Sequence, residues 1–325
     1  MHILIAHPSP IARARLDRAL SAQENVHECT SVTSLSETYH LAEHTQPDAV
    51  VISAPLADCA EFELLKSLMD ILQIVCVFLD DQAPTGTQGE KGVGRVPGDI
   101  TAEALIALIA QLQKQQPAKP RAAKGFQQDA QFDTRRFILI GASTGGVDAL
   151  INVVGGFPEN CPPTFIVQHT GGSFADSLIR LLSTATEAKV VAAKDMEPTE
   201  PGHIYLAPGG QFHLGLRVVR RGRVRLVGNP PISGHRPSVD ALFHSAVPAA
   251  EHVTAALLTG MGRDGADGLL ALRNAGAHTI VQDEVTSVVY GMPRAAKMLG
   301  AASEELPISK ISGALLRASQ KRASA

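Results

Sequence analysis

Short runs of branched apolar residues alternate with amphipathic stretches along most of this chain. In the first third, such runs predict strands at 2–6, 48–53 and 74–79. Apolar residues at helical spacing predict helices at 11–22, 62–72 and 100–113. Alternation of strands and helices is typical of βαβ units, so we expect a parallel sheet here.

The same alternation resumes after residue 135. Strands are predicted at 137–142, 164–168, 253–260 and 278–283. Helices are predicted at 146–154, 173–185, 238–250, 264–275 and 293–299. Residues 214–227 depart from the pattern, because they alternate around Arg221-Gly222 and so predict an antiparallel hairpin. The fold class is therefore α/β, and this half is predicted to be a doubly wound, Rossmann-like, mainly parallel sheet with one antiparallel hairpin.

A stretch between the two halves lacks the branched apolar residues that a core requires. Residues 113–135 are rich in Gln, Lys, Ala and Pro instead, which is typical of a linker. We therefore expect a first domain at 1–112, a linker at 113–134 and a second domain at 135–325.

Composition narrows the class of protein. With 45% hydrophobic and 19% charged residues, the 325-residue chain has enough apolar material for two cores. Aromatic residues are only 4% and Trp is absent, so these cores must be aliphatic. A net charge of −3 gives no reason to expect a nucleic-acid partner. The four cysteines form no CxxC pair, and no signal peptide or membrane-length apolar run is present, so we expect a cytoplasmic protein without membrane insertion.

A glycine-rich turn follows the strand predicted at 137–142. Its residues Gly141-Ala142-Ser143-Thr144-Gly145 satisfy the G-x-S-x-G pattern, in which a sharp strand-to-helix turn exposes a nucleophilic serine. A glycine-rich turn after a strand can also hold the phosphates of a dinucleotide, although the spacing here is not G-x-G-x-x-G.

A serine nucleophile needs a base and an acid that orients the base. His169 directly follows the strand predicted at 164–168, and Asp264 follows the strand predicted at 253–260. Active sites of open parallel sheets form beyond the carboxyl ends of the strands, so we predict a catalytic site of Ser143, His169 and Asp264. The backbone of Met261, in the turn Gly260–Gly262, is the expected oxyanion donor, and Thr144 is expected to shape the same site. This chemistry requires no cofactor and no metal.

Residues 134–320 resemble the catalytic domain of the chemotaxis protein-glutamate methylesterase (CheB) family. The similar segments are IGASTGGVDAL (140–150), IVQHT (166–170), GHIYLAPGG (202–210), HRPSVDALFHSA (235–246), LLTGMGRDGADGL (257–269) and VYGMPRAA (289–296). The resemblance implies that Ser143 is the nucleophile, His169 the base, Asp264 the orienting acid and Met261 the oxyanion residue. It further implies hydrolysis of glutamate methyl esters on the cytoplasmic helices of methylated chemoreceptors, with deamidation of receptor glutamines as a second activity. The family usually has Met-Pro-Pro-Gly after the histidine, whereas this chain has Thr170-Gly171-Gly172-Ser173, which affects the rim of the site.

The first half resembles the receiver domain that regulates this family, a flavodoxin-like fold, but its chemistry is missing. His7 and Pro8 stand where receivers carry acidic Mg²⁺ ligands, and Ser53 stands at the phosphoacceptor position. Val96-Pro97 stands where receivers carry the Lys-Pro pair. A hydroxyl cannot replace the carboxylate that binds Mg²⁺ and accepts the phosphoryl group. We therefore predict a pseudo-receiver without a phosphoacceptor, not controlled by ordinary phosphorylation, which inhibits the enzyme or recruits proteins of a chemosensory array.

Two other functions stay open at this point. A nucleotide-binding oxidoreductase would need a ribose-binding acid after the strand 164–168, where His169 stands instead. A non-catalytic signalling adaptor would explain the altered receiver, but it gives no chemical reason for Ser143, His169 and Asp264 to occur together.

Three further patterns have simpler interpretations. His40-Leu41-Ala42-Glu43-His44 matches the zinc-peptidase pattern H-x-x-E-H, yet no third ligand is evident, so an exposed polar helix face is expected. Arginines crowd the hairpin, where we expect a solvated edge and, as the alternative, a docking site for glutamate-rich helices; they are Arg217, Arg220, Arg221, Arg223 and Arg225. The segment HRPSVD (235–240) is expected to open a helix capped by Ser238, with either a structural role or one in shaping the cleft.

Overall fold

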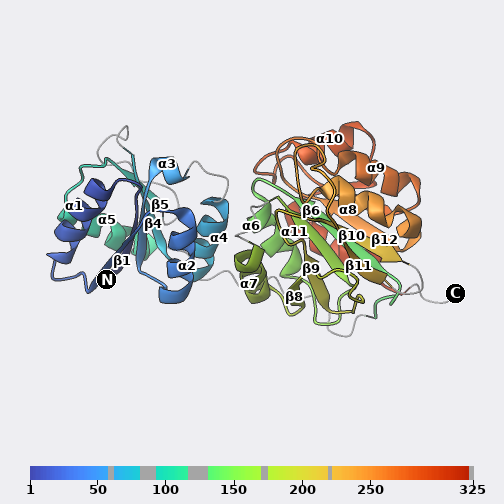
Figure 1. Cartoon of the computed structure of the whole chain (residues 1–325), viewed down its shortest axis with the longest axis horizontal. Coiled ribbons are helices and arrows are strands. Elements are labelled where there is room, and N and C mark those ends of the chain that lie inside the picture. The colour runs from blue at the N-terminus through green and yellow to red at the C-terminus, as the bar shows by residue number, and fades with distance from the viewer. Residues whose placement is uncertain (58–61, 81–92, 116–130, 170–174, 219–221, 322–325) are drawn as a thin grey trace. The chain divides into compact units, whose positions relative to one another are not determined.

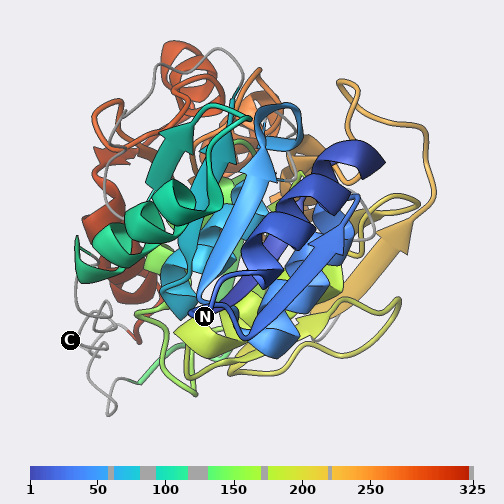
Figure 2. The same cartoon turned by 90° about the vertical axis from the view of Figure 1, so that its left-hand side faces the viewer.

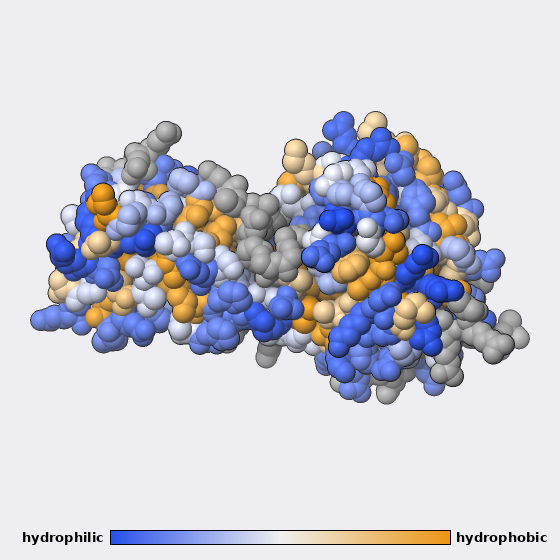
Figure 3. Space-filling model, viewed as in Figure 1, coloured by the Kyte–Doolittle hydropathy of each residue, from blue (hydrophilic) through white to orange (hydrophobic). Residues whose placement is uncertain are grey.

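The computed structural model describes residues 1–57, 62–80, 93–115, 131–169, 175–218 and 222–321. The chain forms two compact units, Met1–Pro120 and Arg121–Ala325 (Figure 1). On the face shown in Figure 3, hydrophilic residues cover much of both units and hydrophobic residues are scattered among them. None of the helices in the described ranges has both the length and the apolar character required to cross a membrane.

The first unit is a five-stranded parallel sheet with helices on both faces. Its strands are β1 (His2–Ala6), β2 (Glu28–Val32), β3 (Ala49–Ser53), β4 (Val75–Leu79) and β5 (Val93–Val96). Its helices are α1 (Pro10–Ser21), α2 (Leu35–Thr45), α3 (Ala54–Ala57), α4 (Phe62–Leu72) and α5 (Ala102–Gln115). The spatial order β2-β1-β3-β4-β5 is that of flavodoxin-like folds, which confirms the predicted fold class of this half. Figure 2 looks onto this unit, with α1 and α5 on the near side of the strands.

The second unit contains a seven-stranded parallel sheet in the order β14-β13-β12-β6-β7-β9-β8. Its strands are β6 (Phe137–Ala142), β7 (Thr164–Gln168), β8 (Lys189–Ala192), β9 (His203–Leu206), β12 (Val253–Leu257), β13 (His278–Gln282) and β14 (Glu304–Leu306). A separate antiparallel pair, β10 (His213–Val218) and β11 (Gly222–Val227), forms the predicted hairpin. The doubly wound α/β prediction with one hairpin is therefore confirmed.

Helices cover both faces of this sheet (Figure 1). They are α6 (Gly146–Val154), α7 (Ala175–Ala185), α8 (Val239–Ala246), η2 (Val247–His252), α9 (Ala266–Asn274), α10 (Met292–Met298) and α11 (Ile308–Ala318). On one face, the inward side chains of α8, α9 and the hairpin form a largely aliphatic core that includes Leu242, Leu269 and Leu214. This core supports the carboxyl ends of β6 and β12, where the candidate site lies.

Some predicted elements differ in extent from those observed. The helix predicted at 238–250 is two elements, because α8 ends at Ala246 and a 3₁₀ helix follows. Pro248 in this 3₁₀ helix lacks the N–H that an α-helix would need at that point. The strand predicted at 253–260 ends at Leu257, and the remaining residues turn out of the sheet into the glycine-rich segment.

Both ends of the predicted linker 113–134 carry structure. Helix α5 continues through Gln115, so the first three residues of the predicted linker are helical. Phe132 is buried and forms an antiparallel bridge with Gln320, so this end of the stretch packs on the second unit. The intervening residues 116–130 lie outside the described ranges.

Candidate active site

The three predicted catalytic residues follow three neighbouring strands of the second sheet. Ser143 comes directly after β6, His169 directly after β7, and Asp264 after the turn that follows β12. Strand β6 lies between β12 and β7, and from β6 the chain first extends the sheet on one side and later on the other. The residues therefore lie around the topological switch point, where open α/β sheets bind ligands.

The backbone of Ser143 is held from both neighbouring strands. Its N–H donates to the Thr259 carbonyl at 3.0 Å, and its carbonyl accepts from the Gln168 amide Nε2 at 2.8 Å. Gly145, two residues later, has φ +75°, a left-handed conformation that permits the sharp turn into α6. The turn leaves Ser143 9% exposed. The backbone that carries the hydroxyl is thus fixed in position, and the residue keeps a small exposed fraction.

His169 forms a tight pair with Asp264. The His169 Nε2 and the Asp264 Oδ2 are 2.7 Å apart, and the two side chains are 8% and 1% exposed. Because a carboxylate only accepts, Nε2 carries the proton and Nδ1 is left with a free lone pair. Nδ1 is buried and has no hydrogen-bond partner among the described residues. The imidazole therefore offers one unused acceptor atom, which is what a general base requires.

Asp264 accepts four hydrogen bonds. Besides His169, its donors are the Ser238 hydroxyl at 2.8 Å and the backbone N–H groups of Val239 and Asp240 at 2.7 and 3.0 Å. Both backbone donors belong to the first turn of α8, where the positive end of the helix dipole also stabilises an anion. Burial by itself would raise the pKa of Asp264, but the His169 bond and the other donors outweigh it and lower this pKa to about 2. Asp264 is therefore a carboxylate at neutral pH.

No hydrogen bond joins the Ser143 hydroxyl to His169 within the described part of the chain. Bonds between a nucleophile and its base are often long in enzymes without substrate and tighten when substrate binds. The arrangement thus comprises an oriented imidazole with an open Nδ1 and a serine on the adjacent strand end.

The predicted oxyanion turn lies against Ser143. A methyl group added at Gly260 would come within 2.7 Å of the Ser143 Cβ, so glycine is needed for this close approach. Gly260 itself is bonded to the Val289 carbonyl, whereas the Met261 N–H makes no hydrogen bond to any described residue. The Met261 side chain is 72% exposed and points away from the core. Thr144, the other predicted residue, accepts a bond from the Thr259 hydroxyl through its carbonyl at 2.9 Å.

Several site residues were not predicted from the sequence. Ser238 was expected to cap α8, in a segment with either a structural role or one in shaping the cleft, and no contact with Asp264 was predicted. It caps the helix by accepting from the Ala241 N–H at 3.3 Å, and its hydroxyl also donates to Asp264. Thr259 and Gln168 fix the backbone of the nucleophile turn, and His235 lies on His169. The segment HRPSVD was the one sequence signal for these residues. It predicted the start of a helix but did not indicate that the segment contacts His169 and Asp264.

Other predicted sites lie elsewhere or outside the described residues. On α2, one ring nitrogen each of His40 and His44 and one carboxylate oxygen of Glu43 lie within 4.8 Å of one another, and both histidines are exposed. Arg217, Arg223 and Arg225 are exposed on the hairpin, and Arg220 and Arg221 fall outside the described residues. So does the stretch Thr170–Ser173 after the histidine. Ser53 ends β3 and is 2% exposed, with its hydroxyl bonded to none of the described residues.

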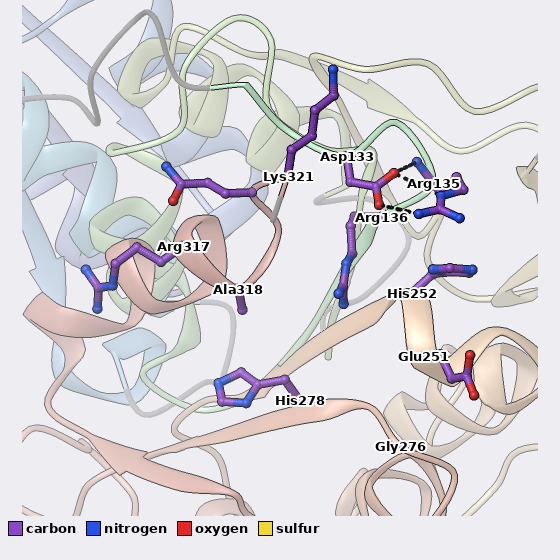
Figure 4. A pocket seen from close by; sticks show the side chains of 11 residues that line it. Asp133, Arg135, Arg136, Glu251, His252, Gly276, His278, Arg317, Ala318 and Lys321 are labelled. Carbon is purple, nitrogen blue, oxygen red and sulfur yellow. Dashed lines mark hydrogen bonds and ion pairs between the residues drawn. The ribbon is translucent and has the colours of Figure 1, made fainter. Parts of the chain in front are cut away.

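A hollow of about 830 Å³ lies at the opposite end of the second sheet, near the amino ends of β6, β12 and β13 (Figure 4). It is lined mostly by polar and charged residues, and two of its basic side chains already have acidic partners. Arg135 binds Asp133 at 2.9 Å, and His278 lies 3.0 Å from Glu304. None of the predicted catalytic residues lines it. It is therefore distinct from the candidate active site.

Comparison with known proteins identifies relatives over both units. The family model described as CheB methylesterase matches residues 138–315. A Rhizobium etli protein named protein-glutamate methylesterase/protein-glutamine glutaminase is 35% identical over 337 residues, covering 98% of this chain and 97% of that protein. A protein of the same name from Gluconobacter oxydans is 49% identical over 187 residues, which are 56% of this chain and 53% of that protein. The solved CheB methylesterase catalytic domain of Thermotoga maritima matches with a TM-score of 0.54 and 35% identity, over 56% of this chain and 97% of that domain.

Proposed function

The chain belongs to the CheB methylesterase family, and from this we propose that it hydrolyses methyl esters on glutamate side chains of chemoreceptor cytoplasmic helices, with Ser143 as the nucleophile. The observation that carries this assignment is the buried His169–Asp264 pair beside Ser143, with the imidazole Nδ1 left open. Membership of the family makes the chain an ester-hydrolysing enzyme, which argues against the adaptor and the oxidoreductase alternatives.

In the proposed reaction, His169 Nδ1 accepts the proton of the Ser143 hydroxyl while Oγ attacks the ester carbonyl carbon. Asp264 stabilises the imidazolium that forms, because its carboxylate already accepts from Nε2. The oxyanion of the tetrahedral intermediate accepts from the Met261 N–H, with Thr144 completing the site; one such donor contributes about 3 kcal/mol in the transition state. The carbon–methoxy bond then breaks, and methanol leaves with the proton from His169.

The second half of the reaction regenerates the enzyme. Water attacks the acyl-enzyme carbonyl, and His169 Nδ1 takes one of its protons and returns it to Ser143 as the ester bond breaks. The product is a free glutamate carboxylate. A glutamine amide has the same carbonyl geometry and would lose ammonia in place of methanol, so the glutaminase activity in the relatives' name extends to this site. No metal or organic cofactor takes part in these steps.

The first unit is proposed to be a pseudo-receiver that does not use ordinary phosphorylation. A flavodoxin-like sheet and Ser53 at the end of β3 support this proposal. The Ser53 hydroxyl is buried, and Asp80, at the end of β4, is engaged with Arg95 at 2.8 Å. We propose that a chemosensory array protein binds this unit. We also propose that the linker between the domain boundaries near 112 and 135 separates it from the enzyme.

The test is methanol release from receptor membranes that carry radiolabelled methyl groups. Full-length protein, Ser143→Ala and the matched surface variant Ser183→Ala, on α7, would be compared, together with a shortened chain that begins at residue 131. Release is expected from the wild type and Ser183→Ala and is expected to vanish in Ser143→Ala. Absence of release from wild type and the shortened chain with a cognate receptor would overturn the proposal. Faster release by the shortened chain would indicate that the first unit inhibits the enzyme.

A further inference from the structure

The ring of His235 lies flat against the ring of His169. Their centroids are 3.8 Å apart and the ring planes differ by 6°, which is van der Waals contact between two nearly parallel imidazoles. His169 thus has three constraints, because its Nε2 is bound to Asp264, its backbone N–H donates to the Ala142 carbonyl, and one ring face is covered. The Asp264 contact alone leaves the ring free to tilt about that bond, and the stack removes this freedom.

A tight turn holds His235 in place. Ile232 and His235 exchange two backbone hydrogen bonds of 3.0 and 2.9 Å, and Ser233 and Gly234 between them have φ values of +51° and +83°. Positive φ at both central residues is the type I′ pattern, a turn with a well-defined geometry. Arg236, the next residue, donates from Nε to the Gly210 carbonyl at 3.0 Å. The ring is therefore presented by a fixed segment.

One short segment contacts both members of the pair. His235 stacks on His169, and three residues later the Ser238 hydroxyl and the following two backbone N–H groups bind Asp264. The base and its orienting acid come from different strands, so a single segment that touches both fixes them relative to each other.

Charge adds a second constraint on His235. Among the described residues, the titratable groups whose charges act on its ring are His169 and Asp264, and Arg236 follows it in the chain. Burial and then the charge of His169 lower the pKa of His235, against the opposing effect of Asp264. At neutral pH, His235 is therefore an uncharged aromatic ring, and such a ring attracts a cation placed over its face.

We infer that His235 is a positioning residue for the proposed reaction, whose uncharged ring fixes the plane of His169 and stabilises the imidazolium formed when Ser143 is deprotonated. The inference rests on the proposed function, because it assigns His169 as the base. It makes two separate demands on position 235, a planar group and the absence of charge.

Three variants separate these demands. His235→Ala removes the plane, His235→Phe keeps an uncharged aromatic plane, and His235→Arg supplies a planar group with permanent charge. We expect His235→Ala to lower kcat about tenfold with KM unchanged, since a cation–aromatic contact of this kind is worth about that factor. His235→Phe should recover kcat to within about threefold of wild type. His235→Arg should have a low kcat and an acid limb moved to lower pH, because a fixed cation disfavours protonation of His169.

The measurements are kcat and KM for methanol release, the pH profile, and the rate of Ser143 labelling by a fluorophosphonate probe on the full chain. His203→Ala is the matched control, because His203 also stacks on an aromatic ring but lies away from the site. Its ring centroid is 5.9 Å from that of Tyr205, and the two ring planes differ by 20°. This variant should match wild type in the kinetic constants, the pH profile and the labelling rate. Should His235→Ala fail to fold, as judged by circular dichroism, the comparison of the Phe and Arg variants still decides the question.

Equal kcat and pH profiles for His235→Arg and His235→Phe, or a folded His235→Ala with wild-type kcat, would overturn the inference. In either case an active wild type and an inactive Ser143→Ala would leave the proposed function standing. Failure of the wild type itself to release methanol would instead reject the proposed function.

Discussion

The substitution Asp264→Asn removes the negative charge of the carboxylate that accepts four hydrogen bonds in the candidate site. The carboxylate accepts from His169, Ser238 and two backbone N–H groups, and it is 1% exposed. An asparagine has one carbonyl oxygen and one NH₂, so its NH₂ must face groups that are themselves donors. The variant therefore leaves buried donors without acceptors and removes the group that keeps the proton on His169 Nε2.

The stability cost follows from the pKa. A carboxyl group whose pKa falls from 3.8 to about 2 on folding is stabilised in its charged form by about 2 kcal/mol. Unsatisfied donors add to this, so we expect a total loss of about 3 kcal/mol at neutral pH. Because the folded pKa is depressed, the charge contribution is complete above about pH 4 and is lost as the pH falls toward 2. Asp264→Asn should lack this acid-dependent part.

The catalytic cost is larger. With the amide in place of the carboxylate, the His169 proton is expected to move to Nδ1, and the proposed base then has no lone pair directed toward Ser143. The same change in serine proteases lowers kcat about 10⁴-fold, and we expect a similar loss here.

Urea unfolding at pH 7 and at pH 3, together with methanol release, measures both effects. Asp267→Asn is the matched control, because Asp267 is an exposed acid on α9 that pairs with Arg263 at 2.9 Å. This variant should lower the free energy of unfolding by less than about 1 kcal/mol and leave methanol release unchanged. A folded Asp264→Asn that keeps kcat within threefold of wild type would refute the role given to the pair.

Three further predictions concern neighbouring features. Gly260→Ala places a methyl group 2.3 Å from the Met292 Sδ as well as against Ser143. Thermal unfolding should show a loss of about 2 kcal/mol, and the methanol assay a loss of activity of tenfold or more. Gly228→Ala is the control, because its methyl group would have its nearest contact at 3.8 Å, and it should change neither stability nor activity. Ser238→Ala removes both the helix cap and a bond to Asp264 and should cost about 2 kcal/mol in urea unfolding; a change below 0.5 kcal/mol in that assay, on the order of an exposed-surface substitution, would contradict the contact. Acetyl phosphate with Mg²⁺ should leave activity and intact mass unchanged, since Ser53 offers a buried hydroxyl, and a gain of one phosphoryl group on the first unit would argue against a pseudo-receiver.

Much of the architecture could be predicted from the sequence, because central strands of parallel sheets are apolar throughout. Strands β1, β3, β4, β6, β7, β12 and β13 are almost fully buried and appear as continuous apolar runs. Strands β2, β5, β8, β9 and β14 were not predicted. All of these except β9 are at sheet edges, where one side is open and polar residues such as those of ECTSV and EEL are tolerated. Strand β9 lies between β7 and β8 and is only four residues long, HIYL, so its apolar run is too short to stand out.

The positions of Ser143, His169 and Asp264 followed from the same logic. Carboxyl ends of parallel strands meet at one edge of the sheet, so residues directly after apolar runs are brought together by the fold. This reasoning gives the neighbourhood of the three residues from their place in the chain. It does not give the distance between any two of their atoms.

Tertiary structure alone decided how the pair is oriented. The sequence places HRPSVD at a helix start, but only packing brings that helix N-terminus onto Asp264 and the His235 ring onto His169, from segments 26 and 66 residues away. The choice of Nε2 for the carboxylate, which leaves Nδ1 for the serine, depends on ring orientation and not on residue type. Side-chain hydrogen bonds and ring stacking act over 3 to 4 Å and depend on angle, whereas a sequence pattern reports only which face of an element is buried.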